Sequence, residues 1–176
     1  MEEASPALAD PWPALDVAWA TAQAARHADD LDDVRDRIDP GRVAVIERGL
    51  RASGVDVARA HSAMVETVEC LRMFMEPFDL LLTPTLPITA FAADADQPGS
   101  VAGKPTSYLS WTPFTYPFNV TGQPAASVPC GFASDGLPVG LQIVGRWHDD
   151  VSVLRAAAAY EEAHPWAHIK PALGPA

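Results

Sequence analysis

The sequence predicts an α/β protein in which helices come first and a small group of short strands follows. Three observations predict this fold class. Apolar residues recur at three- and four-residue spacing through most of the first 76 residues, which indicates amphipathic helices. From residue 78 onward the apolar residues instead form short runs bounded by proline and glycine, which is typical of strands. A last helical pattern at 149–163 precedes Pro165 and predicts a C-terminal helix.

The first helix is expected over 14–37, with its aspartate-rich part, 29–36, continuing it as an exposed face. A calcium-binding loop is the alternative interpretation of these aspartates. Such a loop needs alternating oxygen ligands, a glycine at its sixth position and a closing glutamate. Residues 29–36 lack this pattern, so the sequence predicts no metal site.

A second helix is expected to begin at Asp39-Pro40, where a capping carboxylate precedes a proline in the first turn. It should run to about Ser53, and Gly54 should stop it, because glycine is favoured just after a helix. A third helix is expected over 55–76, where apolar residues form a stripe at helical spacing.

Strands are expected at 78–83, 125–128 and 139–144. The first is a short apolar run and is predicted to be buried. The Asp135-Gly136 turn signal separates the other two strands and predicts a hairpin. Residues 86–110 show no clear period and are predicted to form a long loop, which in a compact domain is often functional.

The net charge argues against two classes of partner, and the cysteines indicate the cellular compartment. The formal net charge is −11, which argues against nucleic acid and anionic membrane, since both need Lys/Arg surfaces. The two cysteines, Cys70 and Cys130, lie far apart in the sequence and are interpreted as reduced thiols of a cytoplasmic protein. No secretory signal and no membrane-spanning run is visible, so a soluble chain without a membrane partner is expected.

The common catalytic motifs are missing from the sequence. It has no G-x-S-x-G elbow, no phosphate-binding glycine loop and no H-E-x-x-H motif. Cys130 could be a nucleophile, but its neighbours Pro129 and Gly131 offer no base to activate it. A small buried thiol at a strand end is the predicted role, and no catalytic residue is assigned.

Three blocks nevertheless carry a specific resemblance. They are FDLLLTPT at 78–85, PFNVTGQPAASVPCG at 117–131 and GLPVGLQIVG at 136–145. In their order and spacing they resemble the C-terminal region of the amidase signature family, which includes aliphatic and aryl amidases and the A subunit of glutamyl-tRNA amidotransferase. The resemblance covers about 14–165 and is firmest over 78–162.

The resemblance implies an α/β/α fold with a mixed central sheet, helices at the N-terminal side, a strand pair and a C-terminal helix. It also implies amide hydrolysis by a serine nucleophile, a second serine joined by a cis peptide, and a lysine that moves protons between them. This chain has no glycine- and serine-rich cluster, and neither Lys104 nor Lys170 sits in the lysine's motif. The catalytic residues are therefore expected in an N-terminal portion outside this chain.

The chain, residues 1–176, is accordingly expected to be a single partial domain with irregular tails at 1–13 and 166–176. Alone it should be inactive. The resemblance implies no metal and no organic cofactor. The expected partners are a small amide substrate in the full-length enzyme, and either the missing N-terminal half or a second copy, because unpaired strand edges favour association.

The resemblance also implies a substrate-facing wall. In the family, the segment before the Phe-Asn block lines the acyl side of the cleft, and here that is 110–119. The expected substrate-binding residues are Trp111, Thr112, Phe114 and Asn119. Glutamine-using relatives carry an acidic residue near the position of Thr112, so an uncharged, aromatic wall favours an apolar or aryl amide. Two alternatives stay open: the aromatics only pack the core, and Asn119 only bridges backbone at a turn.

A second function class also stays open. The chain could be a non-catalytic module that binds a partner protein or a small amide. Hydrolysis by the chain alone would contradict the enzyme-segment hypothesis, because that hypothesis places the catalytic residues elsewhere.

Overall fold

The computed structural model describes residues 1–170. Its helices are α1 (Trp12–His27), α2 (Leu31–Val34), the 3-10 helix η1 (Arg35–Arg37), α3 (Pro40–Arg51), α4 (Gly54–Phe74), α5 (Tyr116–Thr121) and α6 (Asp150–Ala163). Its strands are β1 (Leu80–Pro84), β2 (Ser100–Val101), β3 (Lys104–Pro105), β4 (Ala125–Phe132) and β5 (Pro138–Gly145). Residues 1–11 form neither helix nor strand, and the tail predicted at 166–176 lies partly outside the described residues.

The first predicted helix is interrupted. Helix α1 ends at His27, the chain turns over 28–30, and the short α2 and η1 follow, so a single helix over 14–37 is wrong. Aspartate explains the interruption, because its side chain competes for nearby hydrogen bonds and disfavours helix interiors. Here the Asp30 carboxylate lies 3.0 Å from Nδ1 of His27 at the point where the helix stops.

Helix α3 begins as predicted, with the Asp39 carboxylate accepting a hydrogen bond from the Arg42 backbone N–H at 2.9 Å. The predicted stop at Gly54 is wrong, because α3 ends earlier and Gly54 is the first residue of α4. A capping box starts that helix: the Ser53 hydroxyl accepts from the Asp56 N–H, and the Asp56 carboxylate accepts from the Ser53 N–H. The Ser-x-x-Asp spacing was visible in the sequence.

The main sheet has the strand order β1-β5-β4, and both pairings are antiparallel. The predicted hairpin is confirmed, with both strands longer than expected and a bulge between Pro129 and Gly131. Within residues 1–170 the expected mixed sheet is therefore not formed. The loop predicted at 86–110 contains the two-residue strands β2 and β3, which pair as a small separate ribbon.

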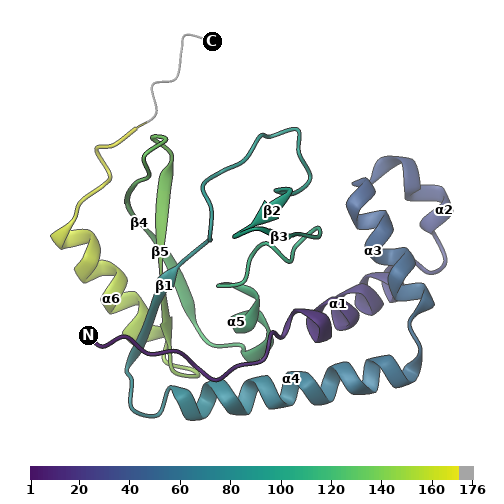
Figure 1. Ribbon diagram of the computed structural model, residues 1–176, viewed down its shortest axis with the longest axis horizontal. Helices are drawn as coiled ribbons and strands as arrows, with labels where there is room; N and C mark the ends of the chain where they lie inside the picture. The colour runs from purple at the N-terminus through teal and green to yellow at the C-terminus, as the bar shows by residue number, and fades with distance from the viewer. Residues whose placement is uncertain (171–176) are drawn as a thin grey trace, which may run out of the picture.

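Helices cover the sheet unequally. Helix α6 lies along one face, where Val153 packs against Ile143 of β5 (Figure 1). On the other face, Val144 packs against Leu71 of α4 and Phe118 of α5. The prediction that the first strand is buried is wrong: Leu82 of β1 is 41% exposed. Strand β1 lies at the edge of the sheet, so within the described residues only β5 flanks it.

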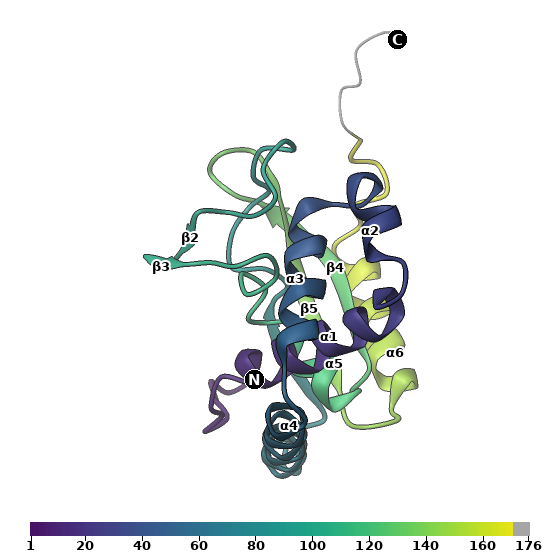
Figure 2. The same cartoon turned by 90° about the vertical axis from the view of Figure 1, so that its right-hand side faces the viewer.

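Helices α1 and α3 form a separate layer beside α4 (Figure 2). Gly49 of α3 lies directly on the α1 backbone, and a Cβ added there would lie 2.0 Å from the Ala20 carbonyl oxygen. Backbone cannot move aside as a flexible side chain can. The close contact of these two helices therefore depends on this glycine. No helix in the described part of the chain is both long and apolar enough to cross a membrane.

The substitution Gly49→Ala should destabilise the protein by about 1–3 kcal/mol, because overpacking forces the two helices apart. Gly54→Ala is the matched control, because nothing lies within 4 Å of a Cβ at that helical position. It should be neutral or slightly stabilising. Urea unfolding followed by circular dichroism measures both variants, and equal midpoints would contradict the packing argument.

Candidate functional site

Polar side chains gather at one end of the sheet face opposite α6. The strand register places Thr83, Gln142 and Ser127 directly across from one another on β1, β5 and β4. Side chains two residues apart share a face of a strand, so Thr85 continues this row. Its hydroxyl oxygen lies 2.6 Å from the Ser127 hydroxyl oxygen, and one of the two donates to the other. The remaining lone pairs of this hydroxyl pair are available to a ligand.

A glycine makes room for the hydroxyl pair. A Cβ at Gly140 would lie 2.7 Å from Thr85 Oγ1 and 2.8 Å from Ser127 Oγ. Any larger residue at this position of β5 would displace one hydroxyl. Within the Gly-Leu-Gln sequence of β5, Gly140 leaves the space under the hydroxyl pair, and Gln142 is the polar residue beside it.

Gln142 ties the aromatic segment to the sheet. Its side chain is only 4% exposed, and its Nε2 donates to Thr83 Oγ1 at 3.0 Å and to the Phe114 carbonyl oxygen at 2.6 Å. Both amide hydrogens are therefore used, as burial requires. Through the bond to Phe114, Gln142 anchors the aromatic segment over the polar end of the sheet, which is a structural role.

A groove of about 710 Å³ opens beside the hydroxyl pair. It is lined by Pro84, Thr85, Leu86, Pro87, Ile88, Thr89, Ala90, Phe114, Ser127, Ala133, Pro138, Val139 and Gly140. The Thr89 hydroxyl donates to the Asp135 carboxylate at 2.8 Å, which fixes the 86–90 rim to the hairpin turn. Hydrogen bonds from the Leu137 N–H and from Thr89 lower the pKa of Asp135. Apolar walls around a few hydroxyls are typical of sites for small organic molecules.

Of the four residues expected to bind substrate, the groove brings in only Phe114. The Trp111 indole N–H donates to the Tyr108 carbonyl, and its ring packs edge-on against Phe91. The Thr112 hydroxyl is likewise turned inward, donating to the backbone three residues earlier. Asn119 is exposed on helix α5, so its placement at a turn is wrong.

Sequence reasoning missed Thr85, Ser127 and Gly140. Part of the signal was present in the sequence, because successive residues of a strand point to opposite faces. This alternation could have placed Ser127 of β4 and Gly140 of β5 on one face of the sheet. The pairing of β1 with β5 was not available, and that pairing brings Thr85 next to Ser127 over a separation of 42 residues.

Cys130 is not the buried thiol that the sequence predicted. It is exposed at the bulge of β4, where the irregular register turns it out of the sheet. Its sulfur lies 3.4 Å from the Val139 carbonyl oxygen, which is a weak hydrogen bond within the hairpin.

One other cavity brings a lysine near two serines. It measures about 530 Å³, and its lining includes Lys104, Ser107 and Ser110. The Ser110 hydroxyl accepts from the Ser107 backbone N–H at 2.7 Å. Among the hydrogen bonds of residues 1–170, none joins the lysine amine to either hydroxyl. Tyr116, also in the lining, donates to Asp10 at 2.8 Å, and burial together with this bond raises its pKa.

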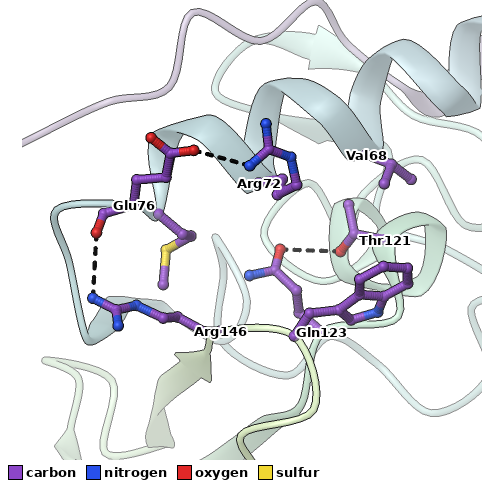
Figure 3. A pocket seen from close by; sticks show the side chains of 8 residues that line it. Val68, Arg72, Glu76, Thr121, Gln123 and Arg146 are labelled. Carbon is purple, nitrogen blue, oxygen red and sulfur yellow. Dashed lines mark hydrogen bonds and ion pairs between the residues drawn. The ribbon is translucent and has the colours of Figure 1, made fainter.

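A smaller cleft of about 240 Å³ lies between the end of α4 and the segment after β5 (Figure 3). The charged groups that line it already form ion pairs and hydrogen bonds with protein groups. Arg72 binds the carboxylates of Glu69 and Glu76, which raises the pKa of its guanidinium. Arg146 donates to the Phe78 carbonyl oxygen at 2.9 Å. No cluster of three or more His, Cys, Asp or Glu side chains suited to a metal ion occurs in the described residues.

Comparison with known proteins gives a consistent result. The family profile described as Amidase matches residues 8–154. The chain is 38% identical to an acylamidase of Rhodococcus erythropolis, over 81% of this chain and 30% of that protein. It is 35% identical to the A subunit of the glutamyl-tRNA(Gln) amidotransferase of Thermosynechococcus vestitus, over 75% of this chain and 27% of the relative.

A solved bacterial aryl acylamidase of the amidase signature family superposes with a TM-score of 0.72 and 30% identity. The superposition covers 89% of this chain and 34% of the other. The chain thus spans about a third of the length of the relatives that it matches.

The substitution Gln142→Leu should lower the free energy of unfolding by about 1–3 kcal/mol, because the part-buried Thr83 hydroxyl and Phe114 carbonyl lose the donor that they share. Amide exchange in 112–116 should also become faster, since the bond to Phe114 is lost. Leu154→Ala, at an exposed position of α6, is the control and should change neither quantity. An unchanged exchange rate in Gln142→Leu would show that the segment is held by other contacts.

Proposed function

Because the chain belongs to the amidase signature family, we propose that it is the part of an amide hydrolase that forms one wall of the substrate cleft. The groove beside the Thr85–Ser127 hydroxyl pair carries this proposal. The serine nucleophile, the bridging serine and the lysine belong to the portion of the domain outside this chain. The three-stranded sheet described here is then part of the larger mixed sheet of the complete domain.

Two observations support the proposal that the substrate wall lies in this chain and the catalytic residues lie outside it. The chain spans about a third of its relatives, so most of such a domain lies beyond the matched part. In addition, Lys104 makes no hydrogen bond to Ser107 or Ser110 in the described structure. A lysine must reach its serine partner to move a proton at the reacting centre.

The reaction of the complete domain follows from this assignment. The serine oxygen adds to the amide carbonyl, and the tetrahedral intermediate expels ammonia or an amine after the leaving nitrogen gains a proton. Water then cleaves the acyl-enzyme and releases the carboxylic acid. The wall described here orients the substrate and excludes water, and the residues outside the chain perform the proton transfers.

The groove chemistry favours an apolar or aryl amide. None of its lining residues is charged, and the Phe114 ring forms one side. The α-ammonium and α-carboxylate of glutamine would find no charged partner among these residues, so burying them would be costly. The free thiols Cys70 and Cys130 fit a reducing compartment such as the cytoplasm.

A chimera tests the proposal. In the R. erythropolis acylamidase, the part that this chain matches is replaced by the corresponding residues of this chain, and aniline release from acetanilide is measured. The chimera should hydrolyse acetanilide, and Phe114→Ala should lower kcat/KM by roughly tenfold or more, because an apolar wall is lost. Phe132→Ala, an exposed phenylalanine outside the groove, is the matched control and should have little effect.

The same chimera locates the catalytic groups. Lys104→Ala should leave the activity of the chimera unchanged. Acetanilide hydrolysis by this chain alone would contradict the proposal that the catalytic serines and lysine lie outside it. A folded chimera that cleaves glutamine and spares acetanilide would argue against the aryl amide. A folded chimera without amidase activity would argue against the function itself.

A further inference from the structure

A tyrosine joins the long 86–115 segment to the layer of helices α1 and α3. The Tyr108 ring stacks beside Trp19 of α1, with ring centroids 6.2 Å apart and planes only 10° from parallel. The same ring lies against the first turn of α3, where a Cβ added to Gly41 would overlap its carbons Cδ2 and Cε2. Within the described part of the chain, no other aromatic pair joins this segment to α1 or α3.

Tyr108 also holds Trp111 through its backbone. The Tyr108 carbonyl oxygen accepts a hydrogen bond from the Trp111 indole N–H at 3.2 Å. The Trp111 ring in turn packs edge-on against Phe91, with centroids 5.2 Å apart. Phe91 directly follows Ala90, the last residue of the 86–90 rim of the groove. A continuous series of contacts therefore runs from the α1–α3 layer, through Tyr108 and Trp111, to this rim.

Backbone turns link Tyr108 to Phe114 at the groove wall. The turns over 109–112 and 112–115 each close with a backbone hydrogen bond, at 3.2 Å and 3.0 Å respectively. Both ends of the segment are fixed, because Tyr108 lies on the helices and the Phe114 carbonyl accepts from Gln142. Packed side chains and hydrogen bonds that follow one another in this way can carry a displacement from one end to the other.

We infer that Tyr108 is a positioning residue, which sets the placement of the Phe114 wall relative to the 86–90 rim and so the fit of the groove to an aromatic ring. This inference rests on the proposed function and makes its specificity depend on helices α1 and α3, whose residues do not line the groove. Gly41 contributes, because any side chain there would push the Tyr108 ring away from α3. Misplacing a substrate-orienting group by about 1 Å can slow a reaction strongly, even when the mutation lies far from the chemistry.

The kinetics of a chimera measure this positioning. The chimera is the R. erythropolis acylamidase carrying residues 8–170 of this chain, so that Trp19, Gly41 and Tyr108 are all present. Tyr108→Ala and Gly41→Ala should each raise KM for acetanilide by roughly fivefold or more, because the apolar groups that contact its ring are displaced. For acetamide, which has no ring, kcat/KM should change by less than about twofold. Tyr108→Phe keeps the ring and should leave KM for acetanilide at its original value.

Gly54→Ala is the matched control for Gly41→Ala. Both glycines lie in the first turn of a helix, but nothing lies within 4 Å of a Cβ added to Gly54. The control should leave KM for both amides unchanged. A substitution that only unfolds part of the protein would lower kcat for both amides equally and leave both KM values unchanged, because it removes active molecules without altering those that remain.

Hydrogen exchange of the chain alone gives a second readout, which needs no amidase activity. The amides of Ser110 and Thr112 each close a backbone turn beside Tyr108. In Tyr108→Ala and Gly41→Ala these two amides should exchange at least about tenfold faster than in the unmodified chain, because the segment has lost its contact with the helices. The amide of Val144, a fully buried residue of β5, should keep its rate.

The outcomes separate this inference from the proposed function. Unchanged exchange of Ser110 and Thr112 overturns the inference, and so does a loss of kcat on both amides with unchanged KM. An active chimera whose variants keep KM for acetanilide also overturns it, while the proposed function stands. Faster exchange together with an inactive chimera supports the positioning by Tyr108 and argues against the proposed function. If Gly41→Ala fails to fold, Tyr108→Ala and Tyr108→Phe decide the matter.

Discussion

Strand β5 is the constraint on which the rest of the structure depends. It pairs with β1 on one edge and β4 on the other, so it fixes the register of the whole sheet. Its side chains alternate between two environments. Ile143 points into the core under α6, whereas Val144 meets α4 and α5 on the opposite face. A one-residue slip would exchange these environments, which is why the register is strongly specified.

The polar site follows from that same alternation. Gln142 is itself buried, lies next to the buried Ile143 on β5, and reaches the Phe114 carbonyl. Glycines on either side allow close approach: Gly140 leaves space for the hydroxyl pair, and a Cβ at Gly145 would lie 2.7 Å from Val153 Cγ2 of α6. One strand therefore positions the helix, the aromatic segment and the hydroxyls together. One wall of the groove belongs to strands β4 and β5, whereas residues 85–90 and Phe114 line it from irregular segments.

The outer edge of strand β1 ends at the groove. Pro84, the last residue of β1, and Thr85, which follows it, line the groove, and the backbone groups of Leu80 and Leu82 in the same strand point away from β5. An element that extends the sheet at β1 would thus arrive close to the groove wall. Under the proposed function, such an element would bring the catalytic groups of the remaining domain to this wall, since catalysis needs reacting groups within hydrogen-bond reach.

The sequence by itself determined the α/β class, the capped start of α3 at Asp39, the β4–β5 hairpin and helix α6, because these depend on periodicity and on turn and capping residues close in the chain. It also identified Phe114 as a candidate for the wall. Only the tertiary structure decided that Thr85 meets Ser127, since hydroxyls far apart in sequence are joined by strand register. It also decided that Leu82 is exposed, because whether an edge strand is buried depends on neighbours that local patterns do not encode.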